Sequence, residues 1–269
     1  MPDGRGIAVV LCTVPCTGTS YVQHALQVAG IPVTSMHSHR EAIRKPTRLD
    51  SLRRFVDDGR LIVCVTLVRE PLAMLVSQSL WSFFGFRLSQ GVPWFDEVDP
   101  AEPDFEWFRR SFHDVNYTNY RNGLLESYFA TEFHEGMGID VLATPFPQSE
   151  GYAVFARDRA TPGNVVGTHC DRLVVLRTDR IDEKLRTALC EAADEAAVPQ
   201  EIRFSTAAVE ARNKGASNKD KPYYESFVRN LRLPDADIRA IYDRPYARHI
   251  LSEAEREHWI GNWTARIRS

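Results

Sequence analysis

Residues 6–21 read GIAVVLCTVPCTGTSY, and this stretch decides the fold that the sequence predicts. Residues 6–14 are apolar and rich in β-branched side chains, which predicts a strand buried on both faces. Residues 19–29 carry apolar side chains at helical spacing, and Gly30 follows them where a C-cap glycine would stand. A strand, a glycine-containing loop and a helix form the first half of a βαβ unit.

The rest of the chain continues this alternation of apolar strands and helices. Residues 60–68 (RLIVCVTLV) and 172–176 (RLVVL) predict two more buried strands. Shorter strands are expected at residues 31–35, 139–143 and 152–156, and helices at residues 49–57, 72–84, 105–135 and 182–197. Three more helices are expected around residues 223–231, 235–246 and 253–266, the last of them capped by Ser252. We therefore expect one α/β domain over residues 1–269, with a mostly parallel sheet, helices on both faces and a helical C-terminal section.

Composition excludes several classes of protein. A net charge of −3 over 269 residues does not suit general binding to nucleic acid or to an anionic membrane. The longest apolar runs are far shorter than the roughly 20 residues that span a bilayer, and the first residues lack the pattern of a signal peptide. We therefore expect a cytoplasmic protein that neither inserts into a membrane nor binds nucleic acid.

The cysteines do not form a recognisable framework. There are five, an odd number, and no two are separated by only two residues: Cys12, Cys16, Cys64, Cys170 and Cys190. Three of them, Cys12, Cys64 and Cys190, fall in apolar strand or helix patterns, where a reduced buried thiol is the usual state. The pattern predicts neither disulfide bonds nor a zinc site.

The loop TGTS, residues 17–20, has the features of an anion site. Backbone N–H groups at the start of a helix, together with a dipole equivalent to about half a positive charge, attract anions. Gly18 permits close approach, and the hydroxyls of Thr17, Thr19 and Ser20 add donors. The same residues could form a simple helix cap. An ATP or GTP phosphotransferase is disfavoured, because the pattern GxxxxGK[ST] is missing and Cys16 stands where such loops carry lysine.

A second anion-binding element follows the strand at residues 60–68. Arg69 comes directly after this strand, and Ser77 lies eight residues further, about two helical turns along the next predicted helix. Both side chains could reach one anion at the carboxyl edge of the sheet. The ordinary alternative for Arg69 is an ion pair with Glu70.

These stretches, VPCTGTSY and VREPLAMLVS, resemble the two cofactor motifs of sulfotransferases that use 3′-phosphoadenosine 5′-phosphosulfate (PAPS). A third stretch, ARNKGASNKDKPYY at residues 211–224, is similar to the family's C-terminal Arg-Lys-Gly loop. Residues 126–146, 173–182 and 218–227 look most like a bacterial branch labelled as capsular polysaccharide synthesis proteins. The resemblance thus extends over nearly the whole chain.

The resemblance implies a P-loop-like sulfotransferase fold and transfer of a sulfuryl group from PAPS to a hydroxyl or amine of a carbohydrate or small metabolite, without a metal. It implies that Arg69 and Ser77 bind the 3′-phosphate and that Tyr21 stacks on the adenine. It implies that the loop after the first strand binds the 5′-phosphosulfate through Cys16, Thr17, Gly18, Thr19 and Ser20. It also implies that the late loop closes over the nucleotide with Arg212, Lys214 and Gly215.

Cys16 replaces the lysine that, in the family, stabilises charge on the departing phosphate. Lys214, or another cation of the late loop, could substitute for it, since three of the five lysines of the chain lie within residues 214–221. Alternatively the protein binds the nucleotide without moving sulfate. In a third possibility Cys16, activated by the helix N-terminus, is the nucleophile of a different reaction.

The segment SMHSH, residues 35–39, supplies the candidate base. Imidazole suits proton abstraction near neutral pH, and the bacterial branch is similar in having a histidine pair after its second strand. In an extended chain His37 and His39 would point to opposite sides, so only one would face the acceptor. His39 is favoured, because the family motif centres on the second histidine. No Cys, Asp or Glu nearby completes a metal-ligand set, so we expect no metal.

Overall fold

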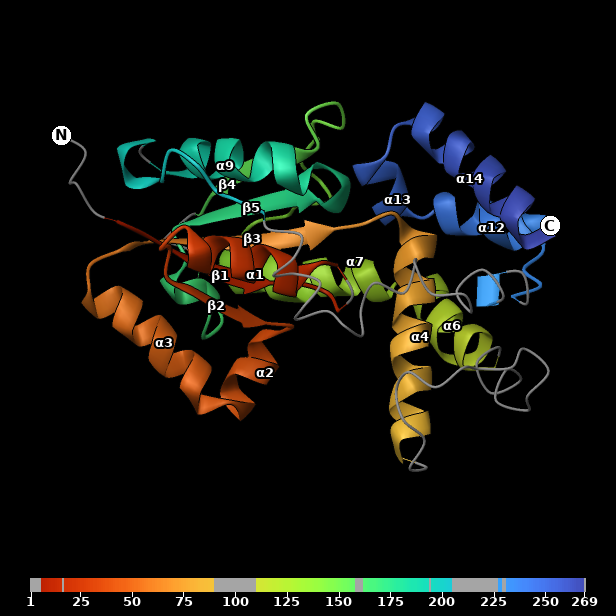
Figure 1. Cartoon of the computed structure of the whole chain (residues 1–269), viewed down its shortest axis with the longest axis horizontal. Coiled ribbons are helices and arrows are strands. Elements are labelled where there is room, and N and C mark those ends of the chain that lie inside the picture. The colour runs from red at the N-terminus through yellow and green to blue at the C-terminus, as the bar shows by residue number, and fades with distance from the viewer. Residues whose placement is uncertain are drawn as a thin grey trace. The chain divides into compact units, whose positions relative to one another are not determined.

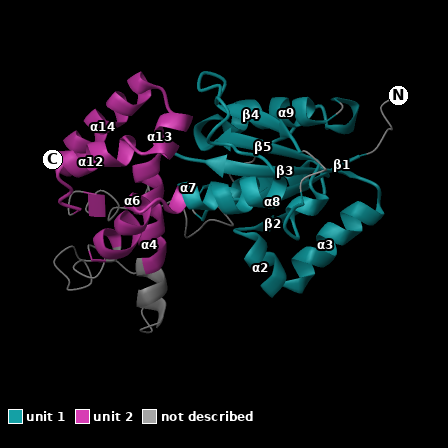
Figure 2. Ribbon diagram, turned by 180° about the vertical axis from the view of Figure 1, so that it is seen from behind, with its two compact units in different colours: residues 1–69, 126–209 teal, residues 70–125, 210–269 magenta. Residues whose placement is uncertain are grey.

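The computed structural model describes residues 6–15, 17–89, 110–157, 162–193, 195–204, 227–228 and 231–268 (Figure 1). The chain divides into two compact units (Figure 2). The first unit comprises residues 1–69 and 126–209, and the second comprises residues 70–125 and 210–269. Each unit is thus assembled from two separate parts of the chain, and the expectation of one domain stays a prediction.

The first unit is built around a five-stranded sheet with the order β2-β1-β3-β5-β4. Three pairs, β1 with β2, β1 with β3 and β3 with β5, are parallel, and β4 runs antiparallel to β5. The strands are β1 (Ile7–Cys12), β2 (Val33–Met36), β3 (Leu61–Val68), β4 (Tyr152–Ala156) and β5 (Arg172–Arg177). The α/β class and the mostly parallel sheet are therefore confirmed.

Strand β1 lies between two parallel neighbours. Val9 is paired with Val33 on one side and with Val63 on the other, and all six residues of β1 are buried. Burial on both faces explains why the strand is a continuous apolar run. The backbone N–H of Thr13 donates to the carbonyl of Met36 at 3.1 Å, so the ends of β1 and β2 stay joined beyond the last residue of β1.

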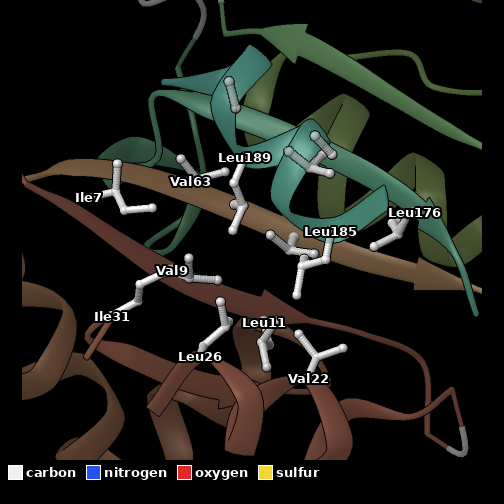
Figure 3. Packing of buried hydrophobic residues seen from close by; sticks show 14 of the residues in the cluster. Ile7, Val9, Leu11, Val22, Leu26, Ile31, Val63, Leu176, Leu185 and Leu189 are labelled. Atoms are coloured by element: carbon white, nitrogen blue, oxygen red, sulfur yellow. The ribbon is translucent and has the colours of Figure 1, made fainter. Parts of the chain in front are cut away.

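One face of the sheet is covered by α1 (Thr19–Val28) and α9 (Ile181–Ala192). Figure 3 shows the packing: side chains of β1 such as Leu11 point toward Leu26 of α1, and Leu185 of α9 lies against the same core. These side chains are fully buried. The spacing of apolar residues along both helices thus produces the face that seals the sheet.

The opposite face is covered by a helical segment that begins with α7 (Leu124–Phe129) and continues through the π-helical η2 (Ala130–His134) into α8 (Glu135–Met137). The Sγ atom of Cys12 lies 3.6 Å from the hydroxyl oxygen of Tyr128, which places this segment against the end of β1. Helices therefore flank both faces, as the sequence predicted.

The remaining described helices of the first unit are short or follow β2. The helices α2 (His39–Arg44) and α3 (Pro46–Asp57) follow β2, and the short 3-10 helices are η3 (Gly167–His169), η4 (Thr178–Arg180) and η5 (Glu195–Ala197).

The described part of the second unit is helical. Its elements are α4 (Pro71–Ser89), the π-helical η1 (Ser111–Tyr117), α6 (Thr118–Arg121), α12 (Asp235–Tyr242), α13 (Pro245–Ile250) and α14 (Glu253–Arg268). Glu70 caps α4, since its two carboxylate oxygens accept from the N–H groups of Leu72 and Ala73 at 2.8 and 2.7 Å. The hydroxyl of Tyr242 donates to the same carboxylate and so links α12 to the start of α4.

The predicted start of α14 at Ser252 is confirmed as a capping box. The Ser252 hydroxyl accepts from the N–H of Glu255 at 3.2 Å, and the Glu255 carboxylate accepts from the N–H of Ser252 at 2.8 Å. The helix predicted around residues 223–231 lies largely outside the described residues.

Two of the predicted elements are wrong. Residues 139–143 form a turn instead of a strand, because the side chain of Asp140 accepts the N–H of Ala143 at 3.1 Å and its carbonyl accepts the Thr144 hydroxyl at 2.9 Å. The alternating apolar residues 139 and 141 are buried without strand pairing. The helix predicted to end at residue 84 is longer than expected, since α4 continues to Ser89. Across the described ranges, no helix has both the length and the apolar character that crossing a membrane requires.

The core packing can be tested on α1. Leu26 is fully buried while Val28 is 57% exposed on the same helix. We expect Leu26→Ala to lower the free energy of unfolding by about 2–5 kcal/mol, because it opens a cavity between α1 and the sheet. Val28→Ala is the control and should change it by less than about 0.5 kcal/mol. Urea denaturation followed by circular dichroism measures both, and equal effects would contradict this packing.

Candidate functional site

The predicted anion loop leaves β1 at Thr13 and enters α1 at Thr19. The Thr17 hydroxyl donates to the carbonyl of Val14 at 2.7 Å, and its side chain is buried. The hydroxyls of Thr13 and Thr19 lie 2.5 Å apart and share one hydrogen bond. Thr17 therefore stabilises the loop, and any contact it makes with an anion has to come from its backbone N–H. Ser20 is exposed.

Gly18 turns the chain into α1. Its φ of 89° lies in the left-handed region, which costs a side-chain-bearing residue about 1 kcal/mol but not glycine. The carbonyl of Gly18 accepts from the N–H groups of Tyr21 and Val22. The N–H groups of Thr19 and Ser20 precede that first turn and have no acceptor within the helix, so they are the donors that the helix offers to an anion.

Tyr21 is packed against the chain itself. One face of its ring stacks on Phe204, with 4.9 Å between the ring centroids and 26° between the planes. Burial and a hydrogen bond to the Asp182 carboxylate raise the pKa of Tyr21 to about 12. The phenol is therefore neutral and oriented, and the predicted stacking on an adenine would have to use its other face.

His37 lies where β2 ends. Its Nδ1 is 2.9 Å from the carbonyl oxygen of Thr13, the residue that begins the loop. A carbonyl only accepts, so Nδ1 carries the hydrogen and Nε2 keeps its lone pair. The backbone N–H of His37 donates to the Glu41 carboxylate at 2.6 Å. His37, one of the two candidate bases, and the anion loop are thus joined at the same edge of the sheet.

His39 is held by a carboxylate that the sequence analysis did not identify. Its Nδ1 lies 3.0 Å from Oε1 of Glu132, and its backbone N–H donates to Oε2 of the same residue at 2.8 Å. The Glu132 side chain is 5% exposed and that of His39 is 18% exposed. A carboxylate that accepts at Nδ1 leaves the lone pair on Nε2, which is the arrangement of a general base.

One signal in the sequence could have revealed Glu132. Leu125, Phe129, Phe133 and Met137 form the buried stripe of a helical segment, and Glu132 is a buried acidic residue within the same segment. An acidic residue on a buried stripe is rarely left without a partner. Its partner lies 93 residues earlier in the chain, so the pairing itself leaves no local pattern.

Buried thiols line the same face of the sheet. Hydrogen bonds with Cys12 and Cys170, together with burial, raise the pKa of Cys64, and burial close to Cys12 raises the pKa of Tyr128. The Cys12 sulfur lies 3.9 Å from Oε2 of Glu132, and none of the described imidazoles forms a hydrogen bond with it. The Cys64 thiol and the Tyr128 phenol are therefore neutral. Cys12 and Cys64 are free and buried, as predicted, whereas Cys190 is only half-buried.

The remaining predicted site residues lie in different units or outside the described residues. Arg69 follows β3 in the first unit, whereas Ser77 lies in α4 of the second unit. Their binding to one anion stays a prediction. Four further predicted site residues lie outside the described ones: Cys16, Arg212, Lys214 and Gly215. In the part of the chain that the structure describes, no group of three or more His, Cys, Asp or Glu side chains could hold a metal ion.

Comparison with protein-family models, with curated proteins and with solved structures found no match for this chain. The site is therefore interpreted from its own geometry. That geometry combines a glycine-turned loop at a helix start with two imidazoles, each held at Nδ1 by an acceptor, at the carboxyl edge of a parallel sheet.

The Glu41 carboxylate, which accepts the backbone N–H of His37, should make the stability of the fold depend on pH. Burial acts to raise the pKa of Glu41, but the hydrogen bonds from Lys45 and from the His37 N–H and the charge of Arg48 outweigh it and lower the pKa to about 2. A lowered carboxyl pKa stabilises the fold above the ordinary value of 4.5, and this contribution is lost as the pH falls toward about 2.

We therefore expect Glu41→Gln to lower the free energy of unfolding by about 1 kcal/mol at pH 7. The difference from the wild type should shrink as the pH falls from 4.5 toward about 2. Denaturant titrations at several pH values check this, and a difference that does not depend on pH would refute it. Asp50→Asn on the exposed face of α3 is the control and should stay close to the wild type.

Proposed function

We propose that this protein is a sulfotransferase that moves a sulfuryl group from PAPS to a hydroxyl or amine of a carbohydrate or small metabolite. The observation that carries the proposal is the His39–Glu132 pair at the sheet edge where the loop of residues 17–20 begins α1. An anion loop suits the phosphosulfate, and an imidazole with its lone pair on Nε2 suits removal of the acceptor proton.

The reaction is a single in-line displacement. The acceptor oxygen forms a bond to sulfur while the bond between sulfur and the bridging phosphate oxygen breaks. Nε2 of His39 takes the acceptor proton, and the products are a sulfate ester and adenosine 3′,5′-bisphosphate. Negative charge grows on the departing phosphate, where the N–H groups of Thr19 and Ser20 stabilise it.

The cation of the site is assigned from the sequence. A preorganised contact to the developing charge contributes about 10²–10³ in rate, and Cys16 cannot provide a positive charge. Lys214 is the proposed replacement, with Arg212 and Gly215 in the same closing loop and with Arg69 and Ser77 on the 3′-phosphate. Under this proposal Lys214→Ala lowers turnover strongly, whereas Cys16→Ala has a mild effect.

The proposed setting is the cytoplasm, where PAPS serves as co-substrate in the biosynthesis of a polysaccharide or a secondary metabolite. The net charge of −3 supports a small-molecule or carbohydrate acceptor over nucleic acid. Aliphatic hydroxyls lose their proton only to a positioned base, which favours a hydroxyl acceptor for a site that contains the His39–Glu132 pair.

Nucleotide binding is the first test. We expect calorimetric titration to detect adenosine 3′,5′-bisphosphate but not ATP, and Arg69→Ala to weaken binding about 10- to 100-fold, because charge-assisted hydrogen bonds contribute about 1.5–3 kcal/mol. Arg60→Ala is the matched control, since Arg60 precedes β3 and Arg69 follows it. The absence of binding would refute the proposed co-substrate.

Sulfuryl transfer is tested with radiolabelled PAPS and a panel of hydroxyl acceptors. His39→Ala should lower kcat by about 10²–10⁴, the usual contribution of a general base, and His37→Ala by much less. The reverse order would make His37 the base. Selective nucleotide binding without transfer to any acceptor would instead support the nucleotide-binding alternative, and a covalent adduct on Cys16 would support a different reaction.

A further inference from the structure

We infer that Glu132 is the positioning residue of His39: it fixes the ring tautomer and the place of the residue that begins α2. This inference rests on the proposed use of His39 as the base. Its own support is a pair of contacts, in which each oxygen of one carboxylate accepts from a different donor of one histidine.

Each carboxylate oxygen of Glu132 faces its own donor on His39. Oε1 faces the ring Nδ1 at 3.0 Å, and Oε2 faces the backbone N–H at 2.8 Å. The backbone donor ties the start of α2 to η2, and the ring donor then sets the rotation of the imidazole. In this geometry each donor faces its own oxygen, an arrangement that a carboxylate provides and an amide does not.

Burial of Glu132 at this position costs folding free energy, which points to a functional role for the His39–Glu132 pair. Burying a carboxylate opposes folding, and an apolar side chain would cover this face of the sheet more favourably. Its other neighbour is a weak donor, because the Cys12 thiol lies 3.9 Å from Oε2 and is itself in contact with Tyr128. Among the described residues, the short hydrogen bonds of Glu132 both come from His39.

The local backbone supports the same conclusion. Glu132 lies in η2, where an α-helix widens into a π-helical segment between α7 and α8. Such insertions distort the regular hydrogen bonding and occur frequently at functional sites. Here the insertion lies at the carboxylate that contacts His39.

A conversion to glutamine separates this role from simple packing. In Glu132→Gln only the carbonyl oxygen of the side-chain amide accepts hydrogen bonds, whereas the NH₂ group donates. The backbone N–H of His39 cannot change its role and takes the carbonyl oxygen, so the amide NH₂ faces Nδ1. The ring then moves its hydrogen to Nε2 and loses the lone pair that would accept the substrate proton.

The direct experiment is nitrogen-15 NMR of the imidazoles in the full-length protein at a pH where they are neutral, with His39→Gln used to assign the His39 signals. We expect the Nδ1–H form in the wild type, the Nε2–H form in Glu132→Gln and an unchanged spectrum in the control Glu135→Gln, which makes the same chemical change at an exposed position of α8. A wild-type ring in the Nε2–H form, or a His39 signal that Glu132→Gln leaves unchanged, would overturn the inference.

Kinetics provides a second readout. Glu132→Gln should lower kcat by about 10²-fold while the KM for PAPS changes less than about twofold, because proton removal and not nucleotide binding is affected. Glu132→Asp keeps two acceptor oxygens and should retain the Nδ1–H form and recover part of the activity. A Glu132→Asp variant as inactive as Glu132→Gln would contradict the positioning role.

The two proposals fail separately. If the NMR result holds but the protein does not bind adenosine 3′,5′-bisphosphate, the His39–Glu132 pair stands and the sulfotransferase proposal falls. If nucleotide binding holds but the His39 tautomer is independent of Glu132, only the positioning role falls. Should Glu132→Gln not fold, the tautomer in the wild type and in Glu132→Asp still decides the inference.

Discussion

The parallel pairing of β1 with β2 and β3 is the constraint on which the candidate site depends. Neighbouring parallel strands end at the same edge of a sheet, so the loop after β1 and the histidines after β2 meet there without any long connection. Two hydrogen bonds fix this junction: the N–H of Thr13 donates to Met36, and the ring of His37 donates to Thr13. The loop geometry and the position of the imidazoles therefore follow from strand register.

The second requirement of the site comes from the face of the sheet. Glu132 reaches His39 from η2, which covers the side of β1 that bears Cys12. The cost of burying its carboxylate is offset by two short hydrogen bonds to one residue. The Cys64 thiol and the Tyr128 phenol remain neutral because burial and contact with neighbouring thiols raise their pKa values. The Glu132 carboxylate thus makes its short contacts with His39 and a long one, 3.9 Å, with the Cys12 thiol.

Local patterns allowed much of the fold to be predicted. The strands β1, β3 and β5 are buried on both faces, and their continuous apolar runs made them recognisable. The anion loop and the histidine pair were also local signals. Residues 139–143 were misleading, since two apolar side chains two positions apart are typical of a strand but are buried here in a turn closed by Asp140.

Long-range pairing could not be predicted in the same way. The contact between His39 and Glu132 joins residues 93 positions apart, and a single sequence contains no periodic trace of it. The hydrogen bond from the Thr17 hydroxyl to the carbonyl of Val14 could not be predicted either, because the sequence TGTS allows this hydroxyl to face either the loop or a ligand. Helix α2 was missed although Ser38 and Glu41 have the spacing of a capping box, and the structure uses Ser38 as the N-cap.

We propose that the loop after β1 binds the phosphate end of the nucleotide beside an imidazole whose Nδ1 is held by Glu132. The most direct measurement is a crystal structure of the protein with adenosine 3′,5′-bisphosphate. We expect the 5′-phosphate to accept hydrogen bonds from the backbone N–H groups of Thr19 and Ser20 while Nδ1 of His39 remains bonded to Glu132. A phosphate bound away from this loop, or a His39 ring turned away from Glu132, would contradict it.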